Sequence, residues 1–229
     1  LETNFRYMDE VLDAFVFIDR NGNVTAERDE DMRLMCTVSH YTNLALAMAR
    51  FNGIPARKRV GFATLGDAEV NYDYTVEDPY ITYEIIEYWD ESAKEWKQAD
   101  PIGQGLEFIP AAKAFADVRS GAADPDKFIN VYEVGIKVLI ENLILDLAAV
   151  RKIDLLTWDR YGWMVRPLDD YSDRTWQILD RLAAQLNEDD KDIDKIFEIY
   201  DSEEGLEVQK NIFIDTPVTP PHKCELKLS

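Results

Sequence analysis

Hydrophobic residues follow a helical period in some parts of the chain and an extended period in others. Residues 38–48 are apolar on nearly every side of a helix, and such a pattern predicts a buried helix. Gly53 is expected to end this helix, and Pro55 prevents it from continuing. The extended run over residues 60–65 then predicts the first strand of a sheet that packs on the helix.

Further along the chain, the patterns predict two more strands followed mainly by helices. Ser172 is a suitable N-cap for one of these helices, because its hydroxyl can accept a hydrogen bond from a free backbone N–H. The tail from Gly205 is rich in proline and is expected to be extended. The expected strands are 81–89 and 95–100, and the expected helices are 5–17, 108–118, 131–150, 173–186 and 193–200.

The composition of the chain argues against several classes of function. The chain has 229 residues, of which 46% are hydrophobic, and this suits one core of ordinary size. Its formal net charge of −20 makes phosphate backbones and anionic membranes poor partners, so we expect no binding to nucleic acid. The densest apolar run, residues 138–150, contains Glu141 and Asp146 and is shorter than the roughly 18 residues of a membrane span. Two cysteines are too few for a disulfide framework, and a cytoplasmic protein is expected.

Residues 38–62 resemble the core of the transglutaminase-like superfamily, which is related to the papain-like cysteine peptidases. In that family a catalytic Cys opens a helix, an aromatic residue follows three positions later, and a Gly-Ile-Pro-Ala-Arg segment ends the helix. Residues 53–57 have this sequence here, and Tyr41 is at the aromatic position. Residues 83–90 resemble the histidine strand of the family, and residues 96–100 resemble its aspartate strand. Residues 123–159 are similar to the helical extension of a bacterial subfamily.

The resemblance implies an α+β fold. A papain-like transglutaminase core is expected over residues 1–120, with the buried helix packed on an antiparallel sheet. A mostly helical extension over residues 121–229 is expected to pack on this core and form one structural unit with it.

The resemblance also implies a Cys-His-Asp triad, from which this chain departs at two positions. Asp100 is kept, whereas Val38 is at the position of the nucleophile and Tyr83 is at the position of the histidine. The family's chemistry needs a thiolate at a helix N-terminus, an imidazole that carries the proton and a carboxylate that orients the imidazole. Val38 offers no nucleophile, and a tyrosine with an ordinary pKa of about 10 is a poor base at neutral pH. The expected site is therefore vestigial.

Cys36 and His40 could together replace the lost groups. They are four residues apart, so on a helix they would share a face and could form a thiolate–imidazole pair. Cys36 is two positions before the nucleophile's place in the sequence. On a helix this corresponds to about 200° around the axis, so Cys36 would face away from Asp100. This geometric objection weakens if Cys36 precedes the helix. The structural alternatives are that Cys36 is a small buried apolar residue, and that His40 is a histidine on the helix surface or one held by hydrogen bonds.

The sequence predicts neither a metal nor a cofactor. It has two histidines, His40 and His222, and no cysteine pair at ligand spacing. Residues 19–30 resemble a calcium loop, but Val24 replaces the required glycine, which favours an ordinary Asn-Gly turn. The alternative of a loose cation site remains for three acidic residues, Asp73, Glu77 and Asp78.

Three hypotheses for the function follow. The first is a catalytically degenerate protein, a pseudoenzyme, that binds a small molecule, a peptide or a protein partner at the vestigial cleft over Val38 and Tyr83. The second is a cysteine-dependent acyl transferase or amidohydrolase with a rearranged site around Cys36, His40 and Asp100. The third is a structural subunit that assembles with other proteins or into a homo-oligomer. A reactive Cys36 would favour the enzyme, and a large apolar surface would favour assembly.

Overall fold

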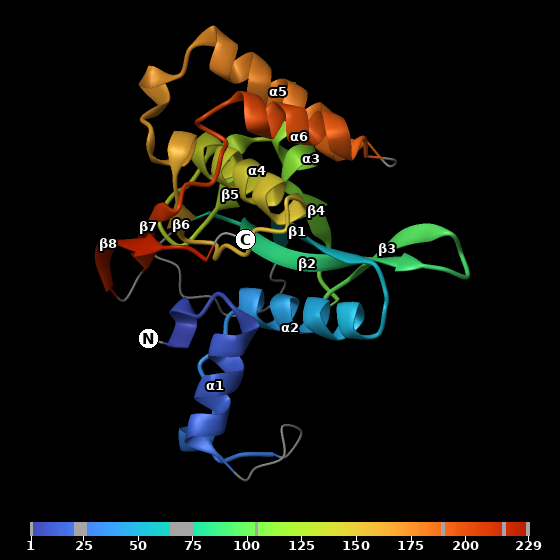
Figure 1. Cartoon of the computed structure of the whole chain (residues 1–229). Helices are drawn as coiled ribbons and strands as arrows, with labels where there is room; N and C mark the ends of the chain where they lie inside the picture. Colours follow the sequence, from blue (N-terminus) through green and yellow to red (C-terminus); the bar gives the residue numbers. More distant parts are fainter. Residues whose placement is uncertain are drawn as a thin grey trace. The chain divides into compact units, whose positions relative to one another are not determined.

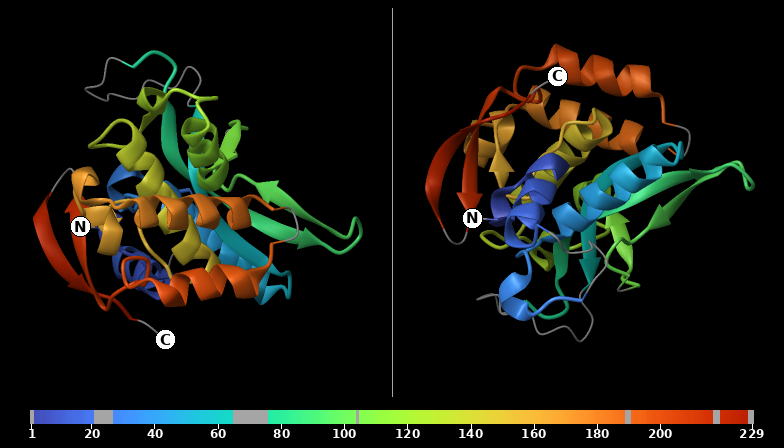
Figure 2. Two further views of the ribbon diagram at one scale, coloured as in Figure 1. Left: turned by 90° about the horizontal axis from the view of Figure 1, so that it is seen from above. Right: turned by 60° about the horizontal axis from the view of Figure 1, so that its bottom comes forward.

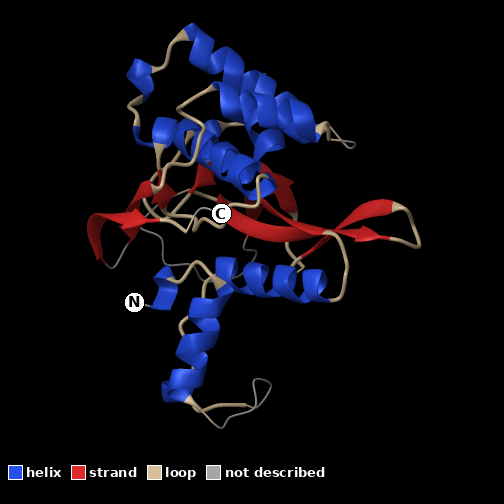
Figure 3. Ribbon diagram, in the orientation of Figure 1, coloured by secondary structure: helices blue, strands red, loops and turns tan. Residues whose placement is uncertain are grey.

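The computed structural model describes residues 2–20, 27–64, 76–103, 105–188, 191–216 and 219–227. The protein is of the mixed α+β class, with helices and two separate groups of strands (Figure 3). Two compact units are present: Leu1–Lys58 with Ile85–Gln104, and Arg59–Glu84 with Gly105–Ser229. Strands β1 (Ala56–Thr64) and β2 (Tyr80–Asp90) contribute to both units. The expected division at residue 120 stays a prediction.

Among its described residues, the first unit contains two α-helices and a β-hairpin (Figure 1). Helix α1 (Met8–Ile18) packs against helix α2 (Val38–Phe51). The second half of β2 pairs with β3 (Glu95–Ala99) in an antiparallel register that places Trp89 opposite Trp96. This hairpin confirms the two strands that the alternating pattern predicts at 81–89 and 95–100.

Local signals set both ends of α2. Thr37 and His40 form a capping box at its start, in which each side chain accepts a hydrogen bond from the backbone of the other residue. At its end, Gly53 adopts a φ of 72°, which is left-handed and favours glycine. The predicted start and stop of this helix are therefore confirmed.

The predicted burial of α2 is wrong. Four large apolar side chains of this helix are exposed to solvent, with exposed fractions of 46% for Tyr41, 40% for Leu44, 59% for Met48 and 91% for Phe51. The buried side of the helix is mostly polar and consists of Ser39, His40, Thr42, Asn43 and Leu46. The polar side chains can be buried because they are hydrogen-bonded: Thr42 Oγ1 donates to the Val38 carbonyl, and Asn43 Nδ2 donates to the Arg6 carbonyl.

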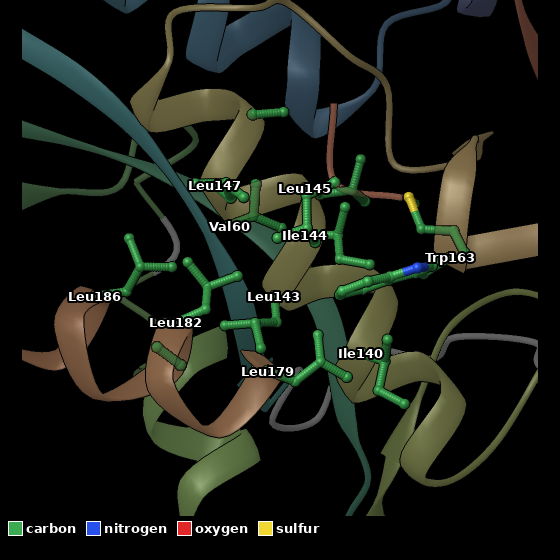
Figure 4. Close-up of a cluster of buried hydrophobic side chains, with 14 of the residues drawn as sticks. Val60, Ile140, Leu143, Ile144, Leu145, Leu147, Trp163, Leu179, Leu182 and Leu186 are labelled. Atoms are coloured by element: carbon green, nitrogen blue, oxygen red, sulfur yellow. The ribbon is translucent and has the colours of Figure 1, made fainter. Parts of the chain in front are cut away.

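The buried helix of the protein is α4 (Ile136–Val150), in the second unit. Every residue of α4 from Val138 to Val150 is buried. Helices α3 (Ala111–Arg119) and α5 (Asp173–Asn187) pack against it, and α6 (Ile193–Ser202) packs on α5 (Figures 1 and 2). Figure 4 shows Leu179, Leu182 and Leu186 of α5 pointing towards the side chains of α4.

Two predicted helices start later in the structure than in the sequence pattern. The expected helix at 108–118 is preceded by a short strand, β4 (Phe108–Pro110), so that α3 begins at Ala111. The expected helix at 131–150 begins only at Ile136, after Gly135, whose φ of 100° interrupts any helix before it. The N-cap at Ser172 is confirmed, since its Oγ accepts a hydrogen bond from the Thr175 N–H.

The larger group of strands has the order β3-β2-β1-β4, and β5 (Phe128–Ile129) pairs with β2 in parallel. The pairing of β1 with β4 is antiparallel and places Phe62 opposite Ile109. The predicted extended tail forms an antiparallel hairpin of β7 (Asn211–Thr216) and β8 (Thr219–Glu225), and β7 also pairs with β6 (Asp159–Arg160). None of the described helices has the length and hydrophobicity needed to span a lipid bilayer.

Candidate functional site

The three positions of the expected triad lie at element ends or within a strand. Val38 is the first residue of α2, and Asp100 directly follows β3; both belong to the first unit. Asp100 Oδ1 accepts a hydrogen bond from the Ile102 N–H at 2.9 Å, so this carboxylate stabilises the turn after β3. Tyr83 is within β2, in the second unit, and is 6% exposed.

His40 is part of the helix cap. Its Nδ1 accepts a hydrogen bond from the Thr37 N–H at 2.9 Å and lies 2.9 Å from Thr37 Oγ1. Burial lowers the pKa of His40, and the charge of Lys58 lowers it further, whereas the backbone carbonyls of Phe5 and Glu2 raise it. A neutral imidazole whose Nδ1 is an acceptor fits a capping role, and the same nitrogen cannot accept a proton without losing the cap.

Cys36 precedes α2, separated from it by the N-cap residue Thr37. The helical-angle objection to Cys36 as a nucleophile therefore does not apply. The stronger argument against Cys36 as a nucleophile is its protonation state. Burial raises the pKa of the Cys36 thiol, and the nearby charge of Glu2 raises it further. A catalytic cysteine needs the opposite shift, since the thiolate is the nucleophile. The enzyme hypothesis requires a lowered pKa at Cys36, and the structure has a raised one.

The described residues contain no group of three or more His, Cys, Asp or Glu side chains that could hold a metal ion. Asp73 and residues 21–26 of the calcium-like loop lie outside the described residues. A solvent-open hollow of about 450 Å³ is lined by Lys210, Glu225, Leu226 and Lys227, and it includes none of the predicted site residues.

Sequence reasoning missed a buried polar cluster in the second unit. Glu141, on α4, is 3% exposed, and its Oε2 lies 3.0 Å from Arg160 Nη2. The same oxygen accepts a hydrogen bond from Asn130 Nδ2 at 3.2 Å. The cluster therefore joins the loop after β5, helix α4 and strand β6. The sequence feature that could have revealed this cluster is Glu141, a charged residue inside an otherwise apolar helical run.

Burial controls the protonation of Glu141. It raises the pKa of this carboxyl to about 7, with the charge of Glu133 adding to the shift, while the charges of Arg160 and Lys137 oppose it. The folded chain therefore binds this proton more tightly than the unfolded chain does. The resulting stabilisation is complete below the unfolded pKa of 4.5 and is lost as the pH rises towards 7.

Glu141→Gln should abolish this pH dependence. We expect the unfolding free energy of the wild type, relative to the variant, to fall by about 3 kcal/mol between roughly pH 4.5 and 7, at about 1.4 kcal/mol per pKa unit. Urea denaturation at several pH values measures the difference. Glu207→Gln, at an exposed carboxylate, serves as the control. A difference that grows as the pH rises would mean instead that an ionised Glu141 stabilises the fold through Arg160.

A second buried pair in the same unit joins β1 to α4. Arg59 Nη2 lies 2.7 Å from Asp146 Oδ2, and Arg59 Nε donates to Asp146 Oδ1 at 2.9 Å. Asp146 Oδ1 also accepts a hydrogen bond from the Val60 N–H at 2.8 Å. Both side chains are almost completely buried, with exposed fractions of 2% and 0%. This two-point pairing positions the strand on the helix.

Comparison with known proteins found no relative of this chain. No protein-family model matches it, and no match was found among the curated proteins or the solved structures.

Proposed function

We propose that this protein is a catalytically silent transglutaminase-like protein with a papain-like core, and that it acts by binding another protein through α2. The observation that carries the proposal is the inverted orientation of this helix, which buries polar side chains and exposes apolar ones. The Gly-Ile-Pro-Ala-Arg segment after the helix supports the family assignment.

The lack of a chemically competent nucleophile supports the absence of catalysis. Val38 has no reactive group at the helix N-terminus. The thiol that precedes the helix, at Cys36, has a raised pKa, and the imidazole in its first turn, at His40, uses its Nδ1 to cap the helix. Without a thiolate and a free base, the transfer of an acyl group from a carboxamide lacks both its attacking atom and its proton carrier.

Four exposed apolar side chains support a binding role, and we call them the α2 stripe: Tyr41, Leu44, Met48 and Phe51. Their spacing of three, four and three residues places them on one face of the helix. An apolar patch of this size equals the largest on a typical monomeric protein, and such patches are often functional. The α2 stripe is thus a better-supported contact surface than the vestigial cleft over Val38 and Tyr83, where ligand binding stays a prediction.

The rate of iodoacetamide alkylation at Cys36 tests the proposal. With Cys224→Ser to remove the other thiol, we expect slow alkylation at neutral pH that rises only above about pH 8.5, because the thiol stays protonated. His40→Ala, made in the same background, should leave the profile unchanged. Fast alkylation near pH 6 that depends on His40 would contradict the proposal, and it would favour the enzyme with a rearranged site around Cys36, His40 and Asp100.

A further inference from the structure

We propose that the partner of the α2 stripe is a second copy of this chain, bound through an antiparallel pair of α2 helices related by a two-fold axis. This inference rests on the proposed function, because it takes the α2 stripe as the binding surface and names its occupant.

The spacing of the α2 stripe is self-complementary. Residues 41, 44, 48 and 51 follow the a–d–a–d positions of two heptads, the pattern by which helices pack side by side. An antiparallel partner presents the same residues in reverse order, and a spacing of three, four and three is unchanged by reversal. Leu44 of one copy then faces Met48 of the other, and Tyr41 faces Phe51. A two-fold interface requires this reciprocity, since each contact must occur twice.

The charge distribution favours contact between two copies at this surface. Each copy carries a formal net charge of −20, so most pairs of surfaces would repel. Residues 32–66, which include all of α2, contain no Asp or Glu. Neither α2 helix therefore contributes a carboxylate of its own to an α2–α2 contact. The antiparallel arrangement also places the positive N-terminal end of each helix beside the negative C-terminal end of the other.

The apolar area of the α2 stripe suits a weak dimer that forms at high protein concentration. At about 200 Å² for a large side chain, the exposed fractions of the α2 stripe amount to roughly 450 Å² in each copy. Two copies would together bury roughly 900 Å² of the α2 stripe, the size of a weak, concentration-dependent interface.

Sedimentation velocity of the chain from micromolar to hundreds of micromolar concentration tests the inference. We expect a concentration-dependent change from 26.4 kDa to about 53 kDa, the mass of two copies. Leu44→Glu and Met48→Lys, each made alone, should remain monomeric, because each buries two unpaired charges in the seam. Val165→Glu, at an exposed apolar residue of the second unit, should dimerise like the wild type. Circular dichroism and thermal unfolding check that each variant is folded.

A mixture of the two charged variants tests the register. In the antiparallel pair, Glu at position 44 of one copy faces Lys at position 48 of the other, so the mixture should recover a dimer that neither variant forms alone. A parallel pair would place 44 opposite 44 and would not be rescued. The inference is overturned if the wild type stays monomeric, if either single variant still dimerises, or if the mixture stays monomeric. These outcomes are independent of the Cys36 alkylation rate, which tests the proposed function.

Discussion

Asp146→Ala is expected to lower the free energy of unfolding by about 3–5 kcal/mol, enough to unfold a marginally stable domain. The reason is that the substitution leaves the guanidinium of Arg59 buried at 2% exposure without its carboxylate. It also removes the acceptor of the Val60 N–H in the middle of a buried strand. Urea denaturation followed by circular dichroism measures the loss.

The matched control removes both charges. Arg59→Met combined with Asp146→Leu replaces the pair with apolar side chains, and we expect it to be much less destabilising than Asp146→Ala alone. Lys113→Ala breaks the exposed pair with Asp117 and should cost less than about 1 kcal/mol. If Asp146→Ala were as mild as Lys113→Ala, the buried pair would not join β1 to α4 as described.

Leu143→Ala should destabilise the fold by about 2–5 kcal/mol, whereas Leu44→Ala should cost less than about 1 kcal/mol. Leu143 is fully buried in α4 against the leucines of α5 (Figure 4), and its truncation leaves a cavity. Leu44 is 40% exposed on α2 and loses few contacts within its own chain. Dilute protein must be used for both variants, so that self-association does not contribute to the measured stability.

Comparing Leu143→Ala with Leu44→Ala shows which of the two helices, α4 or α2, is buried in the fold. Both substitutions remove the same atoms from a helix, so differences in helix propensity cancel. Equal losses, or a larger loss for Leu44→Ala, would mean that α2 is the buried helix that the sequence pattern predicts, and would contradict the exposed α2 stripe.

Local signals allowed several elements to be predicted from sequence. The stop of α2 depends on Gly53 and Pro55, and the start of α5 depends on the Ser172 hydroxyl; each is decided by neighbouring residues. The hairpin of β2 and β3 follows from alternation over a few residues. These features need no information about distant parts of the chain.

Burial could not be predicted in the same way, because it depends on distant partners. The apolar residues of α2 surround the helix, and nothing in the local pattern shows that its buried side is the polar one. Conversely, Asp146 and Glu141 look like solvent-facing interruptions of an apolar run, yet they are buried against Arg59 and Arg160. Arg59 and Asp146 are 87 residues apart in sequence, so no local pattern reveals their pairing.

The spacing of residues in the sequence predicted only part of the chemistry of the candidate site. Spacing placed Cys36 and His40 near the N-terminus of α2, and the structure has them on either side of its N-cap residue, Thr37. It could not show that the imidazole of His40 caps the helix or that burial raises the pKa of Cys36. Both properties depend on the environment of the side chain rather than on the residue types.

Mild peroxide oxidation of methionine tests the central claim, that α2 faces its apolar side to the surroundings. Met48 is 59% exposed and Met164 is 2% exposed, so the chain contains its own buried control. In dilute protein, and in the Leu44→Glu variant where no dimer is expected, peptide mass spectrometry should find that Met48 is oxidised much faster than Met164. If Met48 is as slow as Met164 in the monomeric variant, then α2 buries its apolar side within the fold, and both the binding surface and the dimer derived from it are wrong.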